Sequence, residues 1–253
     1  MMKNSSERDY KEVYVKLRIL INECKKKSQE FSDVKSPTSS HFYASILFTK
    51  ITVTSMTLLS IAPDYEKIGK NEHWDSSSFA TLLRGLLETY LVFFYLCIER
   101  CDEDEWNTRW RLMNYHDHMS RIKLFKSIDD YEEVDKFKTL SAEVKNELEK
   151  TNSFQKLSDG QKKLLLKGTK AFTKSQDEII ESSNNSISDF RFKYIFLSNQ
   201  AHSFPMSFYR MVDNNFGCGV ETPTEIERKS LFISWANECL ESAVKDFVHL
   251  WDK

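Results

Sequence analysis

The sequence predicts an all-α protein, and three observations lead to this fold class. Its 253 residues include six glycines and four prolines, too few for the many turns of a sheet protein. Charged residues make up 29% of the chain and hydrophobic residues 40%, a composition that suits amphipathic helices. Apolar residues recur at spacings of three and four along most of the chain, which is the period of a helix. We therefore expect one all-α domain over residues 1–253.

The bundle is expected to form around residues 79–100, FATLLRGLLETYLVFFYLCIER, the longest apolar run of the chain. A segment that is apolar on all sides is typical of a buried central helix, and the serines at 76–78 are its candidate N-caps. Arg84 and Glu88 interrupt its interior and share one face, because they lie four residues apart. Since a buried charge is costly unless it is paired, we expect polar groups of another helix to meet them.

Two further helices are predicted before the central one. Apolar residues between about 7 and 31 form a single stripe, which indicates an amphipathic helix. Residues 41–61 are rich in β-branched side chains that favour strands. This segment is nevertheless too long for a typical strand and lacks turn signals, so helix is the better interpretation. Pro37 and Pro63 mark the breaks on either side.

The second half of the chain divides into an arm and a return to the bundle. A helix rich in Arg and Trp, within 101–128, begins with acidic residues and continues with basic ones, which complements a helix dipole. Residues 129–181 carry a narrow apolar seam on a charged background, and we expect a charged helical arm or lid inserted in the domain. Such a charge run is most often a solvated face.

A polar stripe distinguishes the helix predicted over about 187–203, which Ser186 or Ser188 caps and Pro205 ends. Its members recur at three and four and are Arg191, Tyr194, Ser198 and His202. A last amphipathic helix follows, with Thr224 as its expected cap.

Charge and cysteine content narrow the function classes. A net charge of -2 argues against a broad basic surface for nucleic acid, although RNA can still bind in a local basic pocket. The five cysteines include no C-x-x-C pair and the first residues have no apolar core, so we expect a cytoplasmic protein without disulfides. Charges at Arg84 and Glu88 disfavour a membrane span. We expect no cofactor, no metal and no membrane partner.

The first candidate site combines Arg84 and Glu88 with the later polar stripe. An imidazole beside a carboxylate and a guanidinium can act as acid or base on a phosphate or ester. The alternative is a buried hydrogen-bond network that is kept for packing alone. The late residues expected at this site are Tyr194, Ser198, Asn199, His202 and Ser203.

The second candidate site is the segment 109–118, RWRLMNYHDH, in which four residues separate Arg111 from His116 and Asn114 lies between them. This spacing satisfies the Arg-x4-6-His pattern of HEPN ribonucleases, to which it is similar. In those helical bundles Arg and His of paired subunits converge on an RNA 2′-hydroxyl and its phosphate. His116 with Asp117 is also similar to the HD dipeptide of helical metal phosphohydrolases, but nothing in the surroundings of other His and Asp residues completes a metal shell.

The order of these features resembles the bacterial domain-of-unknown-function family numbered 5677. The features are R-x3-E at Arg84 and Glu88, the Arg- and Trp-rich helix at 109–115, and Y-x3-S-x3-H-S at 194–203. The resemblance covers the chain from about residue 40 onward. It implies a helical cytosolic bacterial protein, and members look similar to helical toxins and defence effectors related to HEPN folds.

The leading expectation is a metal-independent, HEPN-like ribonuclease or bacterial defence effector, such as an antiviral one. His202 or His116 would serve as acid and base, and Arg84 or Arg111 would stabilise the phosphorane charge. Glu88 would orient a neighbour. The residues expected to hold the substrate are Tyr194, Ser198, Asn199, Ser203 and Asn114.

Two expectations concern partners. A homodimer is expected, because a shallow helical site gains a cleft at a subunit seam. The rival to the ribonuclease is a non-catalytic interaction module that binds a protein through residues 129–181, with both polar faces serving as structural networks. The sequence leaves open whether the protein is an enzyme.

Overall fold

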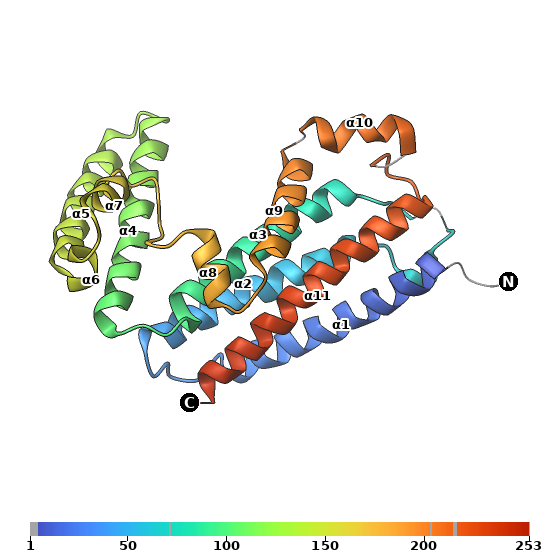
Figure 1. Ribbon diagram of the computed structural model, residues 1–253, viewed down its shortest axis with the longest axis horizontal. Helices are drawn as coiled ribbons and strands as arrows, with labels where there is room; N and C mark the ends of the chain where they lie inside the picture. The colour runs from blue at the N-terminus through green and yellow to red at the C-terminus, as the bar shows by residue number, and fades with distance from the viewer. Residues whose placement is uncertain (1–4, 71, 203, 215–216, 253) are drawn as a thin grey trace. The chain divides into compact units, whose positions relative to one another are not determined.

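The computed structural model describes residues 5–70, 72–202, 204–214 and 217–252, and it confirms the all-α prediction (Figure 1). Within these residues the backbone forms helices and turns, and the extended pairing is confined to one antiparallel bridge between Trp74 and Gly219. The chain divides into two compact units, each described by itself. The first comprises Met1–Ile98 and Ile180–Lys253, and the second comprises Glu99–Ile179.

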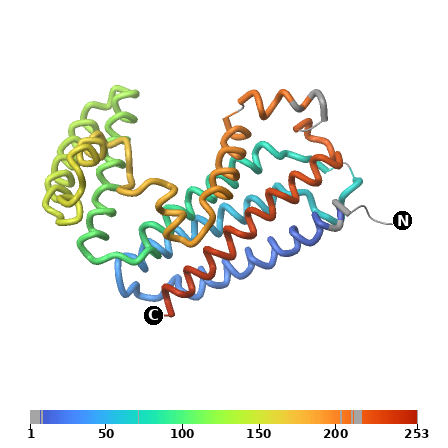
Figure 2. The backbone as a smooth tube through the Cα atoms, in the orientation of Figure 1, coloured from blue at the N-terminus to red at the C-terminus, as the bar shows by residue number. Residues whose placement is uncertain are grey.

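Four long helices build the first unit, and Figure 2 follows their backbone. They are α1 (Ser5–Glu30), α2 (Ser39–Ile61), α3 (Ser76–Phe93) and α11 (Pro223–Trp251). Helix α3 packs against α2, α11 and α9, and α1 packs against α2 and α11. The short helix η1 (Tyr65–Lys67) contacts α1. Helices α2, α3 and α11 also pack against one another and form the centre of this unit.

The predicted central helix is present as α3 with one π-helical turn, Phe94–Ile98, at its end. It starts at Ser76, but Asp75 is its N-cap and accepts a hydrogen bond from the Ser78 N–H at 2.9 Å. The serine caps expected from the sequence are therefore wrong, because the carboxylate directly before them takes that position. Its apolar side chains form the centre of this unit, and the fully buried ones include Phe79, Ala80, Leu83, Leu86 and Phe93.

The polar helix of the first unit is α9 (Ile187–Ala201), which packs against α3. Ser186 caps it as expected, since its hydroxyl accepts from the Asp189 N–H. The helix ends at Ala201, and Pro205 does not simply stop it. This proline begins α10 (Pro205–Asn214), because proline suits the first turn of a helix.

Two apolar segments of the described chain are long enough to cross a membrane by length and composition alone. They are Ser39–Lys67 and Ser76–Ile98. In the second, 61% of the most apolar window is buried inside the protein, whereas in the first the share is 33%. Helix α2 therefore leaves apolar surface uncovered.

A buried polar cluster joins the start of α11 to the start of α3. The Lys229 ammonium donates to the Asp75 carbonyl at 2.7 Å. The Ser76 hydroxyl donates to the Glu225 carboxylate, which also accepts the Gly217 N–H at 2.6 Å. Burial lowers the pKa of Lys229 to about 8, although Glu225 and Asp75 oppose this shift. The sequence analysis missed this cluster, which ties two helix starts together.

The second unit contains α4 (Glu103–Lys126), α5 (Tyr131–Lys150), α6 (Asn152–Gln155) and α7 (Asp159–Leu165). Helices α4 and α5 pack along each other and against α6. The arm was expected at residues 129–181, whereas this unit also contains the Arg- and Trp-rich helix. Its apolar side chains gather in two clusters, Leu112, Leu148, Phe154 and Leu165 in one and Ile122, Val134 and Phe137 in the other. The short helix α8 (Gln176–Ser182) carries the chain back to the first unit.

Replacing Lys229 with methionine should remove a rise of stability with pH. Folding lowers the pKa of Lys229 from 10.5 to about 8. Between these values the unfolded chain binds more protons than the folded chain, so the free energy of unfolding increases with pH. The increase is on the order of 3 kcal/mol over the whole window. Urea unfolding of the wild type and Lys229→Met between pH 8 and 10.5 measures this increase. If the free energy of unfolding changes with pH equally in both proteins, the lowered pKa of Lys229 is contradicted.

Candidate functional site

The structure brings Arg84 of α3 and the polar stripe of α9 together. Arg84 Nη1 donates to His202 Nε2 at 2.7 Å, and Nη2 donates to the Tyr194 hydroxyl at 3.1 Å. The guanidinium carbon also lies 5.1 Å from the centroid of the Tyr194 ring. One arginine therefore holds two side chains that are one hundred residues and more distant in sequence.

Glu88 closes this arrangement one helical turn further along α3. The Tyr194 hydroxyl donates to Glu88 Oε1 at 3.0 Å, and the same oxygen lies 3.1 Å from Arg84 Nη2. The hydroxyl thus accepts from the arginine and donates to the glutamate, which uses both of its roles. The hydrogen bond to Tyr194, together with the nearby Glu88, raises the pKa of Arg84 above its ordinary value. The guanidinium is held in one orientation.

This face of α3 is open to solvent. The Arg84 side chain is 20% exposed and that of Glu88 is 42% exposed, and His202 is an exposed residue. The expectation that these charges are buried within the central helix is therefore wrong in degree, because α9 covers the arginine more than the glutamate. An external molecule can reach the imidazole and the carboxylate.

The geometry also determines the protonation of the His202 ring. Arginine has donors and no acceptor, so Nε2 must present its lone pair to Nη1. In the neutral ring the proton then lies on Nδ1. His202 itself is the C-terminal cap residue of α9, and its backbone N–H donates to the Ser198 carbonyl at 3.1 Å.

The other residues predicted for this site lie in less favourable positions. Ser198 Oγ is buried and bonds to none of the described residues, so it does not face an external ligand. Asn199 donates its side-chain amide to the Ile195 carbonyl of its own helix at 2.8 Å. Ser203 lies outside the described residues. Of the predicted substrate-holding group, Tyr194 alone contacts the Arg84 and Glu88 pair among the residues described here.

A groove borders the site on the other side of Glu88. It has a volume of about 380 Å³ and lies between α2 and α3. Helix α2 contributes Leu47, Lys50 and Thr54 to its walls, and α3 contributes Gly85 and Glu88 among others. Glu88 therefore belongs both to the polar face and to this groove.

The structure does not bring the second predicted group together. Arg111 and His116 are five residues apart on α4, which separates them by about 140° around the helix. Arg111 lies toward α5, where Lys150 and then Arg111 lower the pKa of Glu147. Asn114 donates to the Trp110 carbonyl of its own helix at 2.8 Å. Within one chain these side chains therefore do not lie together, and a site that pairs Arg and His of two subunits stays a prediction.

His116 instead lines a cavity of about 560 Å³ inside the second unit. The segment from Thr169 to Asp177 forms the rest of its wall, including Lys170, Phe172 and Lys174. Its lining thus combines two lysines and a phenylalanine with the carboxylate of Asp177.

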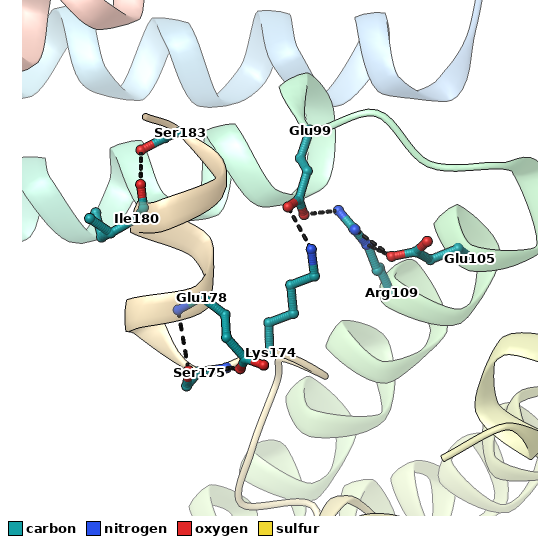
Figure 3. A network of polar contacts seen from close by, with 8 residues as sticks. All are labelled: Glu99, Glu105, Arg109, Lys174, Ser175, Glu178, Ile180 and Ser183. Atoms are coloured by element: carbon teal, nitrogen blue, oxygen red, sulfur yellow. Dashed lines mark hydrogen bonds and ion pairs between the residues drawn. The ribbon is translucent and has the colours of Figure 1, made fainter. Parts of the chain in front are cut away.

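The strongest polar network of the second unit is one that the sequence analysis missed (Figure 3). Arg109 is almost completely buried, and its Nη1 lies 2.8 Å from Glu99 Oε2. It also bonds to Glu105, and Lys174 Nζ lies 2.6 Å from Glu99 Oε1. The Glu105–Arg109 spacing of four was the available signal. These charges satisfy one another and hold the segment around Lys174 in place.

The described residues contain no group of three or more His, Cys, Asp or Glu side chains that could hold a metal ion. The HD alternative therefore lacks a metal-binding cluster in this part of the chain. Burial raises the pKa of the Cys24 and Cys239 thiols to about 12, which makes them poor nucleophiles.

Comparison with known proteins gives one match. A family model described as "Family of unknown function (DUF5677)" matches residues 41–219. No curated protein and no solved structure matches the chain. The matched region includes α3 and α9, and so both halves of the polar face.

Neutral His202 should carry its proton on Nδ1, because Arg84 Nη1 donates to Nε2. Long-range ¹H–¹⁵N correlation spectra distinguish the two tautomers of a ring. In the wild type Nε2 should show the shift of an unprotonated acceptor, and Arg84→Met should change it. A predominantly Nε2-protonated ring in the wild type would show that this hydrogen bond does not form.

Proposed function

We propose that this chain, which belongs to the family of unknown function DUF5677, is a metal-independent, HEPN-like ribonuclease that acts as a bacterial defence effector. The observation that carries the proposal is the 2.7 Å contact between Arg84 Nη1 and His202 Nε2 on an open face. It pairs a proton acceptor with a permanent cation, and phosphodiester cleavage needs both.

The phosphate would bind first. Arg84 presents a planar fork of donors that suits phosphate oxygens. A phosphodiester that takes the Nη1 hydrogen bond releases His202 Nε2 from its partner. The base then becomes free only when the substrate is in place, which couples binding to catalysis.

The chemistry would be an internal transesterification. His202 Nε2 accepts the proton of the ribose 2′-hydroxyl, and the 2′-oxygen forms a bond to phosphorus. The bond between phosphorus and the 5′-oxygen breaks, and His202 returns the proton to that oxygen. The products are a 2′,3′-cyclic phosphate and a 5′-hydroxyl, so atoms and charges balance without water. Arg84 stabilises the charge on the phosphorane oxygens.

Tyr194 and Glu88 would act as positioning residues. The Tyr194 hydroxyl and the Glu88 carboxylate fix Nη2, so Nη1 and its edge of the guanidinium remain for the substrate. A charge held in this way needs little reorganisation during the reaction. Glu88 also keeps the site from becoming strongly cationic, which favours exchange of product.

The rival function, a protein-interaction module, is supported by a different surface. Leu124, Ile128 and Tyr131 are all more than half exposed at the turn between α4 and α5 of the second unit. Exposed apolar side chains that gather at one tip are typical of a contact surface. This tip overlaps the region 129–181 that the sequence suggested for a partner.

His202→Ala should reduce RNA cleavage by about 10²–10⁴-fold, since it removes the proposed acid and base. The assay measures initial rates on a single-stranded RNA and identifies the 2′,3′-cyclic phosphate by mass spectrometry, with and without EDTA. His249→Ala is the matched control, because His249 is an exposed histidine on α11. Equal loss in both variants, or loss of the wild-type rate with EDTA, would contradict the proposal. Absence of any cleavage by the wild type would favour the interaction module.

His116→Ala should leave the cleavage rate within about twofold of the wild type. Arg111 lies on another face of α4, so within one subunit these two side chains do not form a second catalytic pair. The same assay compares His116→Ala with His202→Ala. If His116→Ala is instead the inactive variant, the working site lies in the second unit and the assignment to α3 and α9 fails.

A further inference from the structure

Helix α2 exposes a stripe of large apolar side chains. Phe42, Ile46, Val53 and Met56 are 52%, 50%, 56% and 42% exposed, respectively. At 100° per residue all four lie within about 80° of one another around the helix axis. Exposed apolar residues scattered singly need no explanation, but a continuous helix face does.

The groove between α2 and α3 lies directly beside this stripe. Leu47, Lys50 and Thr54 form its α2 wall, and they follow the stripe around the helix. The α3 wall includes Gly85 and Glu88. The first unit thus presents an apolar ridge and an apolar groove side by side on one face.

Gly85 lies at this groove, and packing within the described chain does not require a glycine there. It lies in the middle of α3, where glycine weakens a helix relative to alanine. A Cβ placed on it would meet no atom within 4 Å, so no neighbour in the described structure requires its absence. Glycine in such a position permits a close approach by another backbone or a ligand.

We propose that a second copy of this chain docks on this face, with the ridge of each copy lying in the groove of the other. A two-fold axis pairs the same patch on both subunits, so a patch that carries both ridge and groove can satisfy itself. The 23 residues of α2 give it a length of about 35 Å. With the adjacent wall of α3, this suits a standard interface of about 800 Å² per partner.

The charges of the groove also favour a second copy of this chain as the bound partner. Lys50 is the single Lys, Arg, Asp or Glu residue of α2, and it forms no ion pair with any described residue. Glu88 lies on the opposite wall of the groove. In a two-fold dimer Lys50 of each copy faces Glu88 of the other, which gives two identical ion pairs at the rim. Lipid acyl chains could not fill the groove, and they would desolvate the Lys50 ammonium without a counter-charge. Glu88 is already paired with Arg84 within its own chain.

One consequence rests on the proposed function. Because Glu88 belongs to both the groove and the polar face, the docked copy would border the Arg84 and His202 pair and supply a second wall to an open site. The interface itself does not depend on any activity, so its test measures mass and not cleavage.

The test is analytical ultracentrifugation of the full chain over a concentration series, combined with light scattering. The wild type should have twice the 29.8 kDa mass of the chain. Val53→Asp should weaken the dimer at least about tenfold, because it buries a charge in the ridge. Ile19→Asp is the matched control, since Ile19 is 59% exposed on α1, outside this face, and it should leave the dimer unchanged.

A charge exchange tests the register of the interface. Lys50→Glu should weaken the dimer, and Lys50→Glu combined with Glu88→Lys should restore it. Circular dichroism and thermal unfolding check that each variant folds.

A monomeric wild type at about 100 μM, a concentration at which interfaces of this size normally associate, would overturn the proposal. So would a dimer that Val53→Asp and Ile19→Asp affect equally. Sedimentation is run in parallel with vesicles of phosphatidylcholine alone and with vesicles of phosphatidylcholine mixed with phosphatidylserine, which is anionic. A monomer that binds vesicles through Val53 would assign the face to lipid and overturn the proposed dimer. An inactive but dimeric protein would contradict only the ribonuclease.

Discussion

The contact between the Arg84 guanidinium and the Tyr194 hydroxyl is the interaction on which the site depends. An arginine on the most apolar helix of the chain costs free energy unless its donors are satisfied. The Tyr194 hydroxyl accepts a hydrogen bond from Nη2 and donates one to Glu88, so three side chains of two helices share one network. The same contact fixes α9 against α3 and thereby places His202 at Nη1, whereas the buried Nε bonds to none of the described residues. The Arg84–Tyr194 contact thus determines both how α9 packs on α3 and where the candidate catalytic histidine lies.

Much of this arrangement could be predicted from the sequence. Arg84 and Glu88 stand out because they interrupt an apolar run, and the requirement for polar partners follows from elementary solvation. The polar residues of α9 recur at spacings of three and four, so the sequence also indicated which side chains could be those partners. The degree of exposure could not be predicted, because it depends on how far α9 extends along α3 before the chain turns at His202. Ser198 illustrates the limit, since it belongs to the predicted stripe but its hydroxyl faces inward.

Other features were missed because local patterns compete with tertiary contacts. The Arg111–His116 spacing matched a known pattern, yet five residues on a helix place two side chains on different faces. Arg109, two residues earlier, belongs to the same basic segment in the sequence. In the structure it instead pairs with Glu99 and Glu105. Lys229 could not be assigned, because its partner is a backbone carbonyl more than a hundred residues away. The spacing of residues along a helix predicts which side chains share a face, but it does not predict which residues of other elements contact that face.

The open face of α3 and the groove beside the exposed stripe of α2 belong to the same unit, and Glu88 is part of both. A buried network would be expected to persist for stability alone, whereas this one leaves an imidazole and a carboxylate accessible. The most direct test of its role compares two single-stranded RNAs that differ in one scissile nucleotide, one with a ribose 2′-hydroxyl and the other with a 2′-O-methyl group. The wild type should cleave the first and leave the second intact at that position, because the attacking oxygen has no proton to give to His202. Cleavage of both at equal rates would contradict the account.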